Sequence, residues 1–201
     1  MQNDFDRFYR GLNFIIAGLI FCIVDINLGS FDILPDILGA GFILFALWEF
    51  SKVVVNEAYK SAINLAMGAA LVEILLGVVD YVYASPSEIL SLISTGVKMF
   101  VIYGLIMFAK AMQIYAEAND LGASFMKWKN VEKLYLWMYF IALGVLSFAI
   151  SILTTFSIID PLTFSVGFLS IPILLVTVIL LLFPLVQTIR VIIGMKREML
   201  N

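Results

Sequence analysis

Long apolar runs constrain the fold of this chain more than any other feature of its sequence. A helix that crosses the hydrocarbon core of a bilayer needs about 20 apolar residues. With 63% hydrophobic and 13% charged residues, the chain has too little polar surface to cover a water-soluble globule. The sequence therefore predicts an all-α integral membrane bundle, with residues 1–201 forming a single membrane domain. Six spans are expected, at about 11–28, 35–55, 62–84, 86–112, 134–159 and 161–194.

The positions of the basic residues predict the orientation of these spans. Eleven of the twelve lysines and arginines lie before the first run, around the junction of runs two and three, around the junction of runs four and five, or at the end of the sixth. Positive flanks are retained in the cytoplasm, so both termini are expected inside and three short hairpin turns outside. The exception is Lys98, which lies within the fourth run.

The longest polar connection, "EANDLGASFMKWKN" at residues 117–130, is expected to be a cytoplasmic turn. In this interpretation Gly122 ends one helix and Ser124 starts the next. Trp128 and Trp137 are predicted to lie in the aromatic belt at the same membrane interface.

Prolines mark the start of each helix that runs back toward the cytoplasm. Pro35, Pro86 and Pro161 each follow an expected outer turn, and proline is tolerated in a first helical turn, where the backbone donors lack partners anyway. Pro172 and Pro184 fall inside the sixth run and predict a kink there.

Four aspartates near the expected outer ends form a candidate acidic cluster: Asp25, Asp32, Asp36 and Asp80. If the helices that carry them are neighbours, their charges would concentrate cations at an outer entrance. The simpler alternative is that they cap helices or are hydrated end residues, as the position of Asp36 in a first turn favours.

Glu73 and Lys98 are the candidate intramembrane pair. Glu73 lies thirteen residues before Pro86 and Lys98 lies twelve after it, so in two antiparallel helices they reach nearly the same depth, close to the midplane. One interpretation is an ion pair that holds the third and fourth helices together. The other is a switch in which protonation of Glu73 releases Lys98.

Asn13 and Glu49 form a candidate inner polar site at similar depth on the first and second helices. Lys52, one turn after Glu49, offers a local ion pair that reaches toward the interface, and this is the simpler interpretation.

Small residues at four-residue spacing predict close contacts between helices. The pairs are Ala66 with Ala70, Ser91 with Thr95, and Ser147 with Ser151.

The absence of histidine, and the presence of only Cys22, argue against a nucleophilic enzyme, a metal centre or a cofactor. No nucleic-acid partner is expected. An acid-only intramembrane enzyme is a further alternative, because "VVDYVY" around Asp80 resembles the tyrosine–aspartate pair of intramembrane aspartyl proteases. The glycine-rich second aspartate motif of that family is missing.

The stretch "INLGSFDILPDILGAGFIL", residues 26–44, resembles a segment of small multispanning membrane proteins of Gram-positive bacteria, in which an Asp-Ile-Leu-Pro-Asp run opens the second helix. The resemblance covers only the first hairpin and implies the bacterial cytoplasmic membrane as the location.

Two main functional classes follow. The chain is either a small transporter-like or channel-like protein, or a non-catalytic scaffold or accessory subunit. The second would assemble with itself or another membrane protein through small-residue helix faces and bind lipid headgroups through its basic inner loop.

Overall fold

The computed structural model describes the backbone of residues 2–24, 33–82, 88–145, 152 and 170–200, and leaves aside the side chains of 2–3, 22–24, 33–37, 79–82, 88–92, 170–178 and 181. Within this part of the chain the fold is all-α, as predicted, and contains no strand. The elements are α1 (Gln2–Val24), α2 (Ile33–Ser51), α3 (Glu57–Val82), α4 (Glu88–Ala118), α5 (Gly122–Leu134), the π-helical segment η2 (Tyr135–Val145) and α7 (Ser170–Met199).

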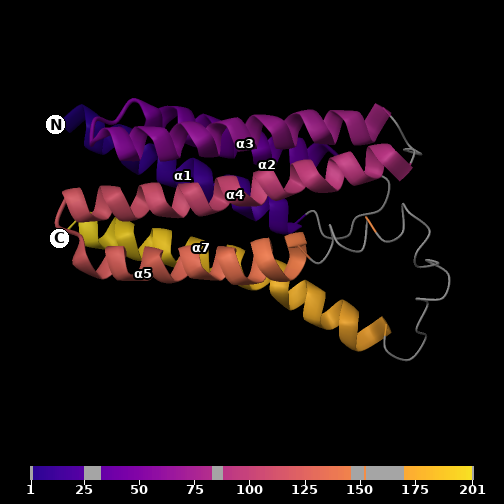
Figure 1. The fold of residues 1–201 in the computed structure, drawn as a ribbon. Helices are drawn as coiled ribbons and strands as arrows, with labels where there is room; N and C mark the ends of the chain where they lie inside the picture. Colours follow the sequence, from indigo (N-terminus) through magenta and orange to yellow (C-terminus); the bar gives the residue numbers. More distant parts are fainter. Residues whose placement is uncertain (1, 25–32, 83–87, 146–151, 153–169, 201) are drawn as a thin grey trace.

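The helices run along one common axis and form a ring. Each of α1 to α4 packs against the next in sequence, α5 and η2 pack against α4, and α7 packs against α5 and η2 and returns to α1. Figure 1 shows both chain termini at one end of this bundle, together with the α4–α5 turn. We call this the termini end. The four regions expected to be basic all lie there: the N-terminus, the α2–α3 connection, the α4–α5 turn and the C-terminus.

The helices at the termini end extend beyond the apolar runs that predicted them. α1 begins at Gln2 rather than near residue 11, and α4 continues to Ala118 rather than ending near 112. The cause is packing, because Phe8 of α1 is completely buried and its ring stacks on that of Tyr115 in α4 at 3.4 Å between centroids. Packing of their inner faces therefore keeps both segments helical beyond the apolar runs, although their outer faces are polar.

The predicted long turn between α4 and α5 is wrong in its details, because most of residues 117–130 are helical. Asp120, not Gly122, ends α4: it has a φ of 56°, in the left-handed region that aspartate tolerates better than most residues. The backbone N–H of Leu121 donates to the carbonyl of Ala116 at 2.8 Å, and that of Asp120 donates to Glu117 at 3.3 Å. Gly122 then begins α5 instead of ending α4.

The start of α5 is capped from a distant part of the chain. The carboxylate of Glu198, near the end of α7, accepts hydrogen bonds from the backbone N–H groups of Ala123 at 3.1 Å and Ser124 at 2.9 Å, and one from the Ser124 hydroxyl. A negative charge at a helix N-terminus also interacts favourably with the helix dipole. This contact joins the C-terminal helix to the α4–α5 turn.

α7 begins at Ser170, so Pro172 lies in its first turn and only Pro184 lies in its interior. The expected helix start at Pro161 falls outside the described residues. Toward its N-terminus α7 leans away from the rest of the bundle (Figure 1).

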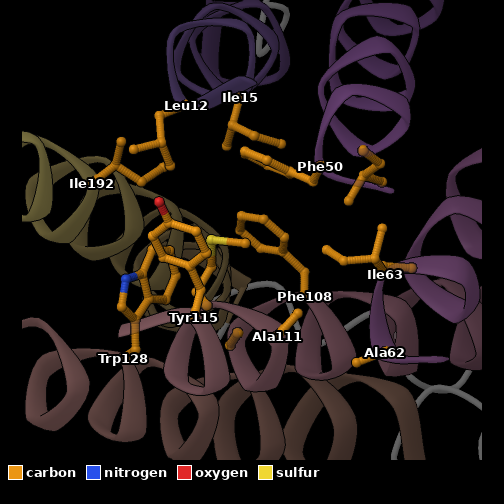
Figure 2. Packing of buried hydrophobic residues seen from close by; sticks show 14 of the residues in the cluster. Leu12, Ile15, Phe50, Ala62, Ile63, Phe108, Ala111, Tyr115, Trp128 and Ile192 are labelled. Carbon is orange, nitrogen blue, oxygen red and sulfur yellow. The ribbon is translucent and has the colours of Figure 1, made fainter. Parts of the chain in front are cut away.

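Aromatic rings fill the centre of the ring at the termini end. Phe50, Phe108 and Tyr115 converge from α2 and α4, and Trp128 of α5 meets Phe108 edge-on at 5.5 Å (Figure 2). Trp128 is completely buried and its indole N–H donates to the sulfur of Met195 at 3.2 Å, so the prediction that it lies in the interfacial belt is wrong. Trp137, in contrast, is 63% exposed.

Small residues allow a close contact between α3 and α4. Of the predicted pair Ala66 and Ala70, both are buried, and Ala66 lies at this contact. A methyl group added to Gly104 of α4 would lie 2.2 Å from the Cβ of Ala69 and 3.7 Å from the Cα of Ala66. Ser91 and Thr95 both lie in α4, but the side chain of Ser91 is not described. Ser147 and Ser151 lie outside the described residues.

Two described helical stretches are long and apolar enough to cross a membrane by length and composition, namely Glu57–Val78 and Ile93–Ala118, and α2 adds a shorter one, Leu38–Ser51. The apolar stretches of α1 and η2 run directly into residues outside the described part.

Candidate binding cavity

A cavity of about 410 Å³ lies inside the helix ring, beyond the aromatic rings of the termini end. It is lined by residues of α1, α2, α3, α4, η2 and α7. Its volume is within the usual range of small-molecule sites, as is its mainly apolar lining with a few polar groups.

The face that α3 turns toward the cavity explains why space remains there. Seven residues of this helix line it: Ala66, Ala69, Ala70, Glu73, Ile74, Leu76 and Gly77. Most recur after three or four positions, which places them on one side of the helix. Four of the seven have no side chain beyond Cβ. At this level the side chains are therefore too small to fill the space between the helices.

On the facing side of α4, larger residues with the same helical spacing line the cavity. Lys98, Val101, Leu105 and Phe108 recur every three or four positions and line the opposite wall. Phe108 closes the cavity toward the termini end, where it joins the buried core. Lys98 lies at the other end of the stripe and is exposed.

Glu73 and Lys98 lie at nearly the same level of the bundle, in agreement with the depth derived from the sequence. Ala69 is opposite Gly104, so in antiparallel helices Glu73 is level with residue 100 of α4. Lys98 lies two residues further, about 3 Å along the axis. Both side chains are exposed, and both line the cavity at its end away from the termini.

A buried hydroxyl pair, which was not predicted from the sequence, also lines the cavity. The hydroxyls of Tyr135 and Thr188 are 2.6 Å apart, and the Thr188 hydroxyl donates to the carbonyl of Pro184 at 2.8 Å. Because a hydroxyl has only one proton, Tyr135 is then the donor to Thr188. A threonine four residues after a proline in an apolar helix was the available signal, since threonine often bonds the carbonyl four residues earlier.

The two residues of the predicted inner polar site have separate partners. Glu49 is buried and pairs with Lys52 at 3.4 Å, the local ion pair predicted from the sequence. The Lys52 ammonium also lies 2.8 Å from the centroid of the Trp48 ring. Asn13 is exposed, and its side-chain oxygen accepts a hydrogen bond from Lys196. These contacts are at the termini end and outside the cavity.

The outer acidic cluster falls largely outside the described part of the chain. Asp25 and Asp32 are not among the described residues, and the side chains of Asp36 and Asp80 are not described although their backbones belong to α2 and α3. Within the described residues, no group of three or more acidic, cysteine or histidine side chains is placed to hold a metal ion.

Comparison of the chain with models of protein families, with curated proteins and with solved structures finds no match.

Proposed function

We propose that this chain is a multispanning protein of the cell membrane, with six spans and both termini inside, that binds a solute in its central cavity during transport. Glu73 and Lys98 contact the charged groups of that solute. In this proposal the fold holds six helices in a ring, and the solute binds in the space that their side chains leave open.

The outer surface of the ring supports the membrane location. Large apolar side chains are exposed on every helix of the ring, which a water-soluble monomer rarely tolerates over so wide a surface. They include Ile20, Phe21, Leu38, Phe45, Trp48, Leu65, Leu71, Leu75, Ile93, Phe100, Trp137, Ile141, Ile179, Phe183 and Val186.

One observation carries the transport proposal. We define the apolar belt as residues 11–24, 38–48, 61–78, 93–109, 134–145 and 179–189, whose backbone is described throughout. Glu73 and Lys98 are the only aspartate, glutamate, lysine or arginine residues in these stretches, and both line the cavity. Ionisable groups inside a membrane are costly and face the bundle interior or a water-filled space, where they mark substrate or ion pathways.

Thiol labelling tests whether water reaches the pair. In a background with Cys22→Ala, single cysteines at Glu73 and at Lys98 are expected to react with a charged, water-soluble maleimide in membrane vesicles. A cysteine at Leu75, which is exposed on the lipid-facing side of α3, is the matched control and is expected to remain unlabelled. Protection of positions 73 and 98 equal to that of the control would contradict transport and favour the scaffold alternative.

Exchanging the two charges separates a switch from a simple ion pair. The double variant Glu73→Lys with Lys98→Glu keeps one charge of each sign in the cavity. If this variant functions in cells as well as the wild-type protein, a proton switch that requires Glu73 itself loses its support. If it folds but remains inactive, the positions of the individual charges matter.

A further inference from the structure

The lining of the cavity is elongated along the bundle axis. Its lining extends from Gly77 to Ala66 along α3 and from Lys98 to Phe108 along α4, which corresponds to about 15 Å at the rise of an α-helix. We call this elongated space the slot. A chain extended along it would contact lining residues over its whole length.

The charged groups lie at one end of this slot. Glu73 and Lys98 form the end away from the termini. The Tyr135 and Thr188 hydroxyls also line the slot, but they bond to each other and to the Pro184 carbonyl. The other walls are aliphatic or methyl groups, such as Ile43, Leu47, Ala70, Val101 and Leu105. A polar solute that filled the slot would lose its hydration without gaining hydrogen bonds along these walls, whereas an apolar chain loses nothing.

The charged end offers one group of each sign at nearly the same level. A ligand head with only one charge would be attracted by one of these side chains and repelled by the other. A head with both charges places its cation at the Glu73 carboxylate and its anion at the Lys98 ammonium, in charge-assisted contacts.

From this arrangement we infer that the cavity binds a single-chain amphiphile with a zwitterionic head group, such as a lysophospholipid. The chain lies between α2, α3 and α4 and ends near Phe108, and the head lies at Glu73 and Lys98. The inference rests on the proposed function, because it names the substrate class of the same cavity.

Photo-crosslinking of the full-length protein tests this inference. The probe is lysophosphatidylcholine with a diazirine at the end of its chain, added to protein in nanodiscs of phosphatidylglycerol, a lipid that lacks the ammonium group. Peptide mapping is expected to place the adducts in the segments around Phe108 and Tyr135. Dodecylphosphocholine is expected to compete about tenfold better than dodecyl sulfate or dodecyltrimethylammonium, each of which lacks one charge. Adducts only on the outer helix faces, or equal competition by chain-free phosphocholine, would overturn the inference.

A substitution that fills the slot provides a second test of the inference. Ala70→Leu is expected to reduce these adducts about tenfold or more, while Ala58→Leu, the same change on the exposed side of α3 outside the cavity, leaves them unchanged. Ile43→Phe fills the slot from α2 if Ala70→Leu does not fold. Unchanged adducts in a folded slot-filling variant would also overturn the inference.

The two proposals fail separately. Reactive cysteines at positions 73 and 98 without lysolipid adducts would leave the proposed function intact and refute the ligand class. Shielded cysteines together with no adducts would refute both.

Discussion

Replacing Gly104 with alanine is predicted to destabilise the protein, because this glycine packs directly against Ala69 of α3. The added methyl would be 2.2 Å from the Cβ of Ala69. Since carbon atoms in contact prefer about 3.5–4.0 Å, the helices must separate by about 1.5 Å. The Ala69 methyl is attached directly to the backbone and cannot rotate away. Overpacking of this kind costs about 1–3 kcal/mol of the free energy of unfolding.

Two variants control this prediction. Gly68→Ala makes the same change in α3, where a new Cβ would have no atom within 4 Å, and it is expected to stabilise the helix by about 0.5–1 kcal/mol. Adding Ala69→Gly to Gly104→Ala removes the clash. The nearest remaining atoms are then the Cα atoms of residues 66 and 69 at 3.7 Å, an ordinary contact, so most of the lost stability should return.

Thermal unfolding in detergent, followed by the fluorescence of the chain's three tryptophans, measures these differences. The expected order of stability is Gly68→Ala above wild type, with Gly104→Ala lowest and the double variant between it and wild type. Equal effects of Gly104→Ala and Gly68→Ala would refute the close contact. So would a double variant less stable than Gly104→Ala alone.

Two further predictions concern contacts of α7. Glu198→Ala is expected to cost about 1–2 kcal/mol and to speed amide exchange at Ala123 and Ser124, because their N–H groups lose their acceptor; exchange no faster than with Glu117→Ala would contradict the cap. Tyr135→Phe is expected to cost about 1 kcal/mol through the lost hydrogen bond to Thr188, and a melting temperature equal to that of wild type would argue against this bond.

The helical character of the chain and the convergence of Glu73 with Lys98 were predictable from sequence. Both depend on short-range counting: apolar runs define helices, and equal distances from Pro86 define equal depth in one hairpin. The close contact at Ala66 was equally accessible, since small residues at helical spacing mark tight helix pairs.

The ring, the cavity and the position of Trp128 were not predictable in this way. They depend on α7 returning to cover α1 and α5, a contact between distant segments that no local periodicity encodes. Trp128 met the criteria for an interfacial residue, but its packing against Phe108 and Met195 makes it a core residue. The helix end at Asp120 was missed for a different reason, because Gly122 offered the commoner signal two residues later.

The most direct test of the account is the membrane side on which the termini end lies. A cysteine in place of Lys127, in the Cys22→Ala background, is exposed on α5 at this end. A membrane-impermeant maleimide is expected to label it only after the cells are permeabilised. Equal labelling in intact cells would place the basic end of the bundle outside and contradict the proposed membrane topology.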